Sequence, residues 1–281
     1  MKMKIEKLYI FQQDADAHLI TYIRDNPPEM NNDPRPALLI CPGGGYEWTS
    51  ERESEPVALQ FLARGYNVFV LKYSVAKMAS QLRPLCEAAL SIKHIREHST
   101  EYNIDTKRVY ILGFSAGGHL ACSAGTLYKH DAVKNAIQNE DTAICRPDGM
   151  ILCYPVITAT CPTHIGTRNN FCGSDEPSEE LLHLFSLDLH VEKDTPPTFI
   201  WHTETDDAVP VQNSINFANA LKNAGVIHEL VLFPEGHHGL SLATHETCHE
   251  IPENEPHPAS AWVELADKWI NNLKQEVQFK K

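Results

Sequence analysis

The sequence predicts an α/β fold with a mostly parallel sheet of about eight strands flanked by helices. Short apolar runs bounded by turn residues recur along the chain. Helical apolar patterns lie between several of these runs, as in repeated βα units. The length of 281 residues lets roughly three quarters of the chain's surface be buried in one core. We therefore expect a single domain over residues 1–281.

Eight segments have the composition of strands. Two short stretches, near 5–10 and 18–23, are expected to form an antiparallel pair at the start of the chain. The other six are short, mostly apolar runs that fit the parallel part of the sheet: 37–41, 67–73, 108–114, 149–154, 198–203 and 228–233.

Apolar residues at helical spacing predict helices between the strands and after the last one. One stripe covers 82–97 and another covers 211–224. The C-terminal segment has the clearest pattern, and its apolar side chains must dock on the sheet: Trp262, Leu265, Ala266, Trp269, Ile270 and Leu273.

Two stretches depart from the alternation of strands and helices. Residues 156–196 are polar, contain Pro162, Gly166, Gly173 and Pro177 and have one short helical pattern near 181–185. We expect them to form a small insertion over the carboxyl ends of the strands. Residues 241–258 contain three prolines and are expected to form a long surface loop.

The composition excludes several classes of protein. The net charge of −13, from 37 acidic and 24 basic residues, would repel nucleic acid. No apolar run approaches the ~18 residues of a membrane-spanning helix, so no membrane partner is expected. Glu6 and Lys7 interrupt the apolar stretch that a signal peptide would need, and we expect a cytoplasmic protein. The sequence leaves the oligomeric state open, a homo-oligomer included.

The eight cysteines are expected to be free thiols. They are scattered along the chain without a C-x-x-C spacing, and the chain is not a small secreted framework.

A candidate nucleophile lies where the strand 108–114 meets a helical pattern. Gly113-x-Ser115-x-Gly117 has the spacing and the strand-to-helix context of a nucleophile elbow, in which a sharp turn exposes the serine Oγ. Glycines beside the serine leave the room that such a turn requires. The alternative is a Gly-rich packing turn without chemistry.

A serine nucleophile needs a base and a group that orients the base. Two adjacent aspartates, Asp206 and Asp207, follow the seventh predicted strand, and His237 and His238 follow the eighth. Each signal alone is weak, because an aspartate after a strand is often a turn or helix cap and a loop histidine is usually solvated. Their order along the chain, Ser then Asp then His, adds weight.

The run CPGGGY ends the strand 37–41. Three successive glycines can present backbone N–H groups to a developing oxyanion, although a plain flexible turn would have the same composition. Tyr46, Glu47 and Trp48 follow and are expected to rim the site. Their aromatic rings would stack on a sugar or aryl group, or pack against the insertion.

A competing motif is H-E-x-x-H, matched by His245, Glu246 and His249. Two histidines at this spacing bind zinc only when a helix brings them to one face. The segment lies beside prolines and lacks a helical stripe, so we expect a loop without a metal. His119 and His202 are expected to be packed structural histidines.

Four segments together resemble the α/β-hydrolase superfamily, in its branch of acetyl-xylan-esterase-like and other small-acyl carbohydrate esterases. They are ALLICPGGGYEWTS, GFSAGGHLA, PPTFIWHTETDDAVPVQNS and FPEGHHGL. The similarity extends over most of the chain from about 36 to 275. It implies the α/β-hydrolase fold, with the small insertion over the strand ends, and a reaction without a cofactor.

The resemblance also implies roles for six residues. Asp206 is the aspartate of the family's D-x-x-V-P pattern, which leaves Asp207 as a turn or capping residue before the helix that starts near Val211. Pro42 departs from the family, because it stands where the lipase-type His-Gly-Gly-Gly motif has histidine. The implied nucleophile, acid and base are Ser115, Asp206 and His238, and the implied oxyanion hole is formed by Gly44, Gly45 and Ala116.

The resulting hypothesis is a serine carboxylic-ester hydrolase that removes short acyl groups, such as acetyl, from a sugar or a similar small alcohol. The expected partner is a small-molecule ester. A formamidase or another amidase with the same triad is the nearest alternative. A non-catalytic binding module on the same scaffold is a second alternative, although such modules usually lose a triad member. A zinc peptidase is the poorest fit.

Overall fold

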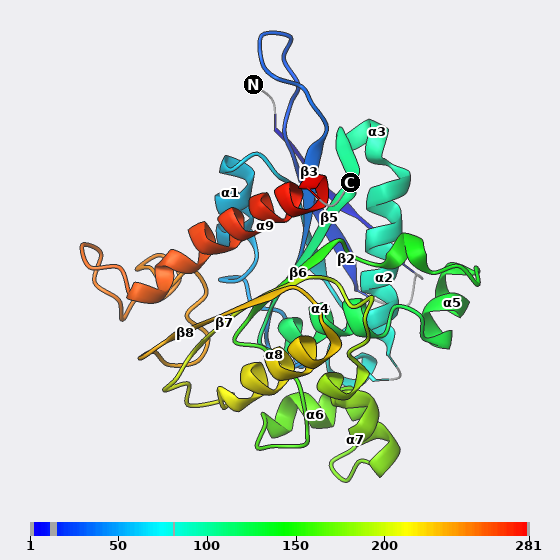
Figure 1. Ribbon diagram of the computed structural model, residues 1–281, viewed down its shortest axis with the longest axis vertical. Helices are drawn as coiled ribbons and strands as arrows, with labels where there is room; N and C mark the ends of the chain where they lie inside the picture. Colours follow the sequence, from blue (N-terminus) through cyan, green and yellow to red (C-terminus); the bar gives the residue numbers. More distant parts are fainter. Residues whose placement is uncertain (1–2, 12–15, 81, 280–281) are drawn as a thin grey trace.

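Eight strands form one sheet in the computed structural model, which describes residues 3–11, 16–80 and 82–279 (Figure 1). The strand order is β1-β2-β4-β3-β5-β6-β7-β8. The strands are β1 (Lys4–Leu8), β2 (His18–Ile23), β3 (Arg35–Cys41), β4 (Asn67–Lys72), β5 (Ile104–Phe114), β6 (Gly149–Cys153), β7 (Thr198–Thr203) and β8 (His228–Phe233).

The sheet is parallel except at its N-terminal edge. β1 pairs antiparallel with β2, and β2 pairs antiparallel with β4. All remaining neighbours run parallel, with Leu39 of β3 opposite Ile111 of β5 and Leu112 of β5 opposite Ile151 of β6. The predicted antiparallel pair and mostly parallel sheet are thus confirmed. β5 is longer than expected, since it begins at Ile104.

Helices cover both faces of the sheet (Figure 1). One face is packed by α1 (Glu55–Ala63) and α9 (Trp262–Phe279). The other is packed by α2 (Arg83–Glu97), α4 (Ala116–Thr126) and α8 (Gln212–Ala224), with α5 (Asp131–Ile137) beside α2. The short elements are α3 (Ser99–Tyr102), η1 (Ala76–Met78), η2 (Ala143–Cys145), η3 (Leu187–His190) and η4 (Pro258–Ala261).

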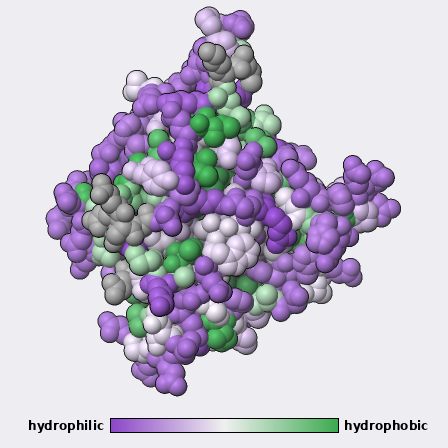
Figure 2. Space-filling view, turned by 180° about the vertical axis from the view of Figure 1, so that it is seen from behind, coloured by the Kyte–Doolittle hydropathy of each residue, from purple (hydrophilic) through white to green (hydrophobic). Residues whose placement is uncertain are grey.

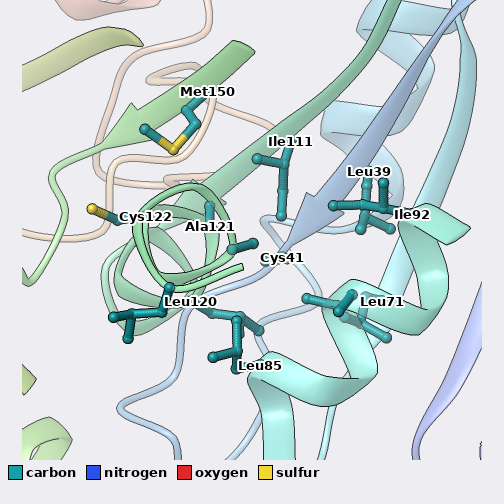
Figure 3. Close-up of a cluster of buried hydrophobic side chains, with 14 of the residues drawn as sticks. Leu39, Cys41, Leu71, Leu85, Ile92, Ile111, Leu120, Ala121, Cys122 and Met150 are labelled. Carbon is teal, nitrogen blue, oxygen red and sulfur yellow. The ribbon is translucent and has the colours of Figure 1, made fainter. Parts of the chain in front are cut away.

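Successive residues of each central strand point alternately to the two faces of the sheet, and each face has its own hydrophobic core. Leu39 and Ile111 point to the α2 and α4 side, where Figure 3 shows them with Leu85, Ile92 and other apolar side chains. Their chain neighbours, such as Leu112, face α1 and α9. Because both faces of the sheet are buried, the central strands are apolar throughout and do not alternate with polar residues.

The insertion between β6 and β7 holds two α-helices, of which the sequence predicted one. α7 (Glu179–Phe185) was expected, and α6 (Ile165–Cys172) was not. α6 has no clear apolar stripe, and its N-cap is His164, a residue outside the usual Ser, Thr, Asp and Asn caps. The two helices pack against each other below α4 and α8 (Figure 1).

The surface drawn in Figure 2 is mainly hydrophilic, as the charged and polar composition of the chain predicts. Hydrophobic residues are scattered on this face. Among the helices of the described residues, none has the length and hydropathy needed to cross a bilayer. All eight cysteines lie in the described ranges, and they are free thiols, as expected.

Candidate active site

Ser115 lies at the turn between β5 and α4 with a strained backbone. Its φ of 52° and ψ of −116° fall where residues with a Cβ rarely lie. The turn is held from both sides, because the Ser115 amide donates to the carbonyl of Cys153 at 3.0 Å and its carbonyl accepts from the amide of Val156 at 3.1 Å. This conformation is the one expected of a nucleophile elbow.

The glycine after the serine is required by close packing. A Cβ added to Gly117 would lie 2.1 Å from the carbonyl oxygen of Cys41 at the end of β3. Real Cβ atoms do not approach this closely, so α4 can begin beside β3 only with glycine here.

The structure brings the three residues predicted for nucleophile, base and acid into one hydrogen-bonded chain. Ser115 Oγ lies 2.8 Å from His238 Nε2, and His238 Nδ1 lies 2.7 Å from Asp206 Oδ2. They come from the loops after β5, β8 and β7. Carboxyl ends of parallel strands meet at one edge of a sheet, which is where ligands bind in open α/β sheets.

Asp206 is held as a carboxylate by its surroundings. Its Oδ1 accepts from the amides of Ala208 and Val209, and its Oδ2 lies 3.1 Å from His202 Nε2 as well as near His238. Burial alone would raise the pKa of this carboxyl. Hydrogen bonds from His202 and His238 outweigh that effect and hold the pKa well below its usual value. A permanent negative charge therefore faces the His238 ring.

His202 does more than fill space in its strand. Its Nδ1 accepts from Ser214 Oγ at 2.7 Å, and its Nε2 faces both Asp206 and the carbonyl of Val209. His202 thus contacts Oδ2 of Asp206, while the backbone amides of Ala208 and Val209 hold Oδ1. A polar residue within a wholly buried apolar strand is a signal of such a bonded role.

Asp207 lies in a bend after β7, which is one of the two roles expected for it, and it does not cap the following helix. α8 begins after Val211, and no side chain caps it. Asp207 Oδ1 instead accepts from the backbone amide of His238 at 2.9 Å. The two adjacent aspartates thus hold different parts of His238: Asp206 contacts its ring and Asp207 contacts its backbone.

The glycine loop after β3 passes directly over the serine. A Cβ on Gly43 would lie 3.2 Å from Ser115 Cβ. Gly44 has a φ of +126°, and a Cβ there would overlap the carbonyl of Trp48, so this position accepts only glycine. Within the described residues, no protein acceptor is bonded to the amides of Gly44, Gly45 or Ala116. These three N–H groups keep their hydrogen-bonding capacity, and Gly44 and Gly45 line the pocket beside Ser115.

A buried glutamate holds the loop that lacks the family's usual histidine. Glu53 is 3% exposed, and its carboxylate accepts from the amide of Gly43 at 2.8 Å and from the hydroxyl of Tyr154 at 2.6 Å. Tyr73 also donates to the carbonyl of Pro42 at 2.6 Å. Sequence reasoning missed Glu53, because nothing in the polar run around it marks one glutamate as buried.

Tyr46 does not rim the site, which corrects the expectation for this residue. Its φ of 58° turns the ring inward, and it is 1% exposed. Its hydroxyl lies 3.0 Å from His119 Nδ1, while His119 Nε2 lies 2.9 Å from the carbonyl of Phe185. Burial lowers the pKa of His119 to about 4, so this histidine is neutral and structural, as expected.

A pocket of about 290 Å³ opens beside the serine. Trp48 is 55% exposed at its rim, and Glu47 is exposed beside it, as expected. His164 from the insertion also lines it, and burial together with the nearby His238 lowers the pKa of His164. Neither His164 nor Arg52 had a sequence signal. The lining residues are Gly44, Gly45, Glu47, Trp48, Ser50, Arg52, Glu53, Ser115, His164, His238 and Gly239.

The H-E-x-x-H motif does not form a zincin site. Residues 241–250 form turns rather than a helix, and His245 Nδ1 lies 2.8 Å from the carbonyl of Ile251. Among the described residues, one group offers three metal-type ligand atoms within 4.8 Å of one another: His237, Cys248 and Glu250.

The arrangement around Ser115 has the parts that acyl transfer requires. A hydroxyl that lines the pocket contacts an imidazole, a buried carboxylate orients that imidazole, and the glycine loop lines the same pocket. Sheet order, helical layers and this constellation define an α/β hydrolase. Residues 26–221 match the BD-FAE family model, and the chain belongs to the BD-FAE family.

Known proteins agree with this assignment. The chain is 40% identical over 215 residues to Endo-1,4-beta-xylanase B of Butyrivibrio fibrisolvens, covering 75% of this chain and 33% of that protein. It is 28% identical over 242 residues to the acetylxylan esterase of Xylanibacter ruminicola, covering 84% and 46%. The chain thus spans between a third and a half of these relatives.

A solved structure matches over nearly its whole length. The acetyl ester-xyloside bifunctional hydrolase from Caldicellulosiruptor lactoaceticus superposes with a TM-score of 0.80 at 36% identity, covering 96% of each chain. The α/β-hydrolase fold predicted from the sequence is therefore confirmed.

Proposed function

We propose that the protein is a serine carboxylic-ester hydrolase that removes short acyl groups, acetyl foremost, from a sugar or a similar small alcohol. The observation that carries the proposal is the chain of hydrogen bonds from Ser115 through His238 to Asp206. The names of the acetylxylan esterase and of the acetyl ester-xyloside hydrolase support the acyl group and the sugar.

The reaction starts with attack on the ester. Ser115 Oγ bonds to the carbonyl carbon while His238 Nε2 takes the hydroxyl proton, and Asp206 stabilises the imidazolium that results. The carbonyl oxygen becomes an oxyanion and accepts from the free amides of the glycine loop and Ala116. When the tetrahedral intermediate collapses, the alcohol leaves with the proton from Nε2, and the acyl group stays on Ser115.

A water molecule then reverses these steps. His238 Nε2 takes a proton from the water, and the hydroxide attacks the acyl carbon. Collapse releases the carboxylic acid, and Ser115 Oγ recovers its proton. The 20% exposure of the His238 side chain leaves the imidazole accessible to this water.

The small volume of the pocket supports a small acyl group, and the tryptophan ring at its rim supports a sugar as the alcohol. About 290 Å³ beside Ser115 is shared between both parts of the substrate. Trp48 presents an exposed ring at the rim, where the apolar face of a sugar can stack.

A substrate panel tests the proposal. Aryl esters from acetyl to octanoyl, acetylated xylo-oligosaccharides and N-formylkynurenine are compared for kcat/KM, with Ser115→Ala as the inactive control. We expect rates to fall beyond roughly butyryl, because each poorly fitted methylene costs ~1–3 kcal/mol. Faster turnover of octanoyl than of acetyl esters would contradict the acyl assignment, and a preference for N-formylkynurenine would indicate the amidase.

A further inference from the structure

Three side chains with metal-binding atoms meet beside the candidate active site. His237 precedes the base in the loop after β8, while Cys248 and Glu250 belong to the loop 241–258. His237 Nε2 lies 3.4 Å from Cys248 Sγ and 3.8 Å from Glu250 Oε2. Ligands of a tetrahedral zinc ion, with bonds of about 2.0–2.3 Å, lie roughly 3.4–3.6 Å apart. All three atoms lie within 4.8 Å of one another, so side-chain adjustments would bring them to the spacing of ligands around one ion.

The imidazole of His237 is oriented as in metal sites. Its Nδ1 lies 2.7 Å from the carbonyl oxygen of His238, so Nδ1 carries the proton and donates it to that oxygen. The lone pair of Nε2 then faces the thiol and the carboxylate. A backbone carbonyl that accepts from the second ring nitrogen is the usual outer partner of a metal-bound histidine.

The other two ligands combine rigidity with access. Cys248 is 4% exposed, and its amide donates to the carbonyl of Thr244 within a turn. Arg52 fixes the same turn by donating to the carbonyl of Thr247 at 2.9 Å. Glu250 is exposed, and His237 is partly so, which gives an ion a route from solvent and leaves one position for water.

We propose that His237, Cys248 and Glu250 bind one Zn²⁺ ion, with water as the fourth ligand. Binding releases the thiol proton of Cys248, and the thiolate and the carboxylate then balance the two positive charges of the ion. Thiolate and imidazole together favour zinc over calcium or magnesium. The ion joins the loop of His238 to the loop 241–258 and stabilises both.

The site is separate from the chemistry at Ser115. His238 Nε2 contacts Ser115, whereas His237 Nε2 contacts Cys248. The ion is a structural link between two loops, and the proposal stands whether or not the ester is the substrate. The H-E-x-x-H segment takes part through its internal cysteine and the glutamate after it, and its two histidines are not ligands.

Metal titration of the full chain tests the site. Protein freed of metal with a chelator is titrated with Zn²⁺ by calorimetry, and with Co²⁺ while thiolate-to-cobalt charge-transfer absorption is recorded. We expect one equivalent to bind, with a charge-transfer band, and zinc to raise the Tm. Cys248→Ser should abolish the band and weaken zinc binding at least ~10-fold. His249→Gln, which changes an exposed histidine of the same loop, should retain both.

His237→Gln provides a second variant if Cys248→Ser fails to fold, because the His237 side chain is 41% exposed. It should weaken binding to a similar degree, and far-UV circular dichroism checks its fold. Absence of saturable zinc binding, an unchanged cobalt band in Cys248→Ser, or loss of binding in His249→Gln alone would overturn the proposal.

Discussion

Two loops meet at Ser115, and they are held in different ways. The glycine loop is fixed from inside the protein by the carboxylate of Glu53 and by the hydroxyls of Tyr73 and Tyr154. The loop of His238 is fixed at the surface, where Asp207 accepts from the His238 amide. Tyr154 connects them, since its hydroxyl also accepts from the amide of Ser241 and its ring contacts the His238 ring.

The difference fits the role that the proposed function gives to each loop. Amides that stabilise an oxyanion act best when they need not move during the reaction, and buried bonds to a rigid carboxylate keep them in place. In the proposed reaction the imidazole exchanges a proton and admits water, and one side of its ring is open while buried Asp206 fixes the other. Changes to buried supports should therefore cost more activity than changes at the surface.

The largest effect is expected from the two adjacent aspartates. Asp206→Asn removes the charge that orients the His238 ring, and kcat should fall on the order of 10⁴-fold with the fold intact. Asp207→Asn keeps an oxygen that can accept from the His238 amide, so its kcat should stay within about tenfold. Steady-state kinetics on an aryl acetate measures both, and the reverse ranking would place the acid at Asp207.

Acid should weaken the support beneath the glycine loop through His119. The pKa of this histidine is about 4 in the buried site and 6.5 in the unfolded chain. Between these values the unfolded state binds more protons, so stability is complete above pH 6.5 and falls as the pH drops toward 4, by about 3 kcal/mol. His119→Gln should flatten this part of the pH profile in urea unfolding. An equally steep profile in the variant would assign the loss to other groups.

Glu53→Gln tests the buried support directly. Each carboxylate oxygen of Glu53 accepts one hydrogen bond, from the Gly43 amide or from the Tyr154 hydroxyl. Glutamine has an NH₂ group in place of one of these oxygens, and that group cannot accept, so the loop should shift. We expect kcat to fall about 10- to 100-fold with KM nearly unchanged, by comparison with the loss of one oxyanion donor. Glu51→Gln, at an exposed position of the same segment, is the matched control. A raised KM with normal kcat would argue against a role in holding the amides.

The smallest effect is expected at the open rim. Trp48→Ala should raise KM for acetylated xylo-oligosaccharides by about 2- to 10-fold, because one stacking contact contributes ~0.5–1.5 kcal/mol. KM for methyl acetate, which offers no ring, should be unchanged. An equal change for both substrates would show that Trp48 supports the loop rather than the sugar.

The sequence predicted the strands of the sheet and the edge of the sheet at which the candidate site lies. Continuous apolar runs gave the strands, and the positions of Ser115, Asp206 and His238 after three strands placed them at one edge. The same reasoning could not choose the direction in which a loop side chain points. Tyr46 and Trp48 are two residues apart in one loop, yet the first is buried and the second is exposed.

The supports of the site depend on contacts between distant segments. Glu53 is buried because Gly43 and Tyr154 converge on it, and Tyr154 is 101 residues away. His164 reaches the pocket from the N-terminus of α6, although its own segment had no helical stripe. The pattern of neighbouring residues in the sequence does not indicate such distant partners, and the structure is needed to find them.

Covalent labelling of Ser115 tests the central claim most directly. A fluorophosphonate ester reacts with an activated serine by losing fluoride and leaving one phosphonyl group on Oγ, and peptide mass spectrometry locates it. We expect one group per chain on the peptide that contains Ser115, loss of ester hydrolysis in proportion to labelling, and no label in Ser115→Ala. Labelling of that variant, or full hydrolysis by a completely labelled protein, would contradict the account.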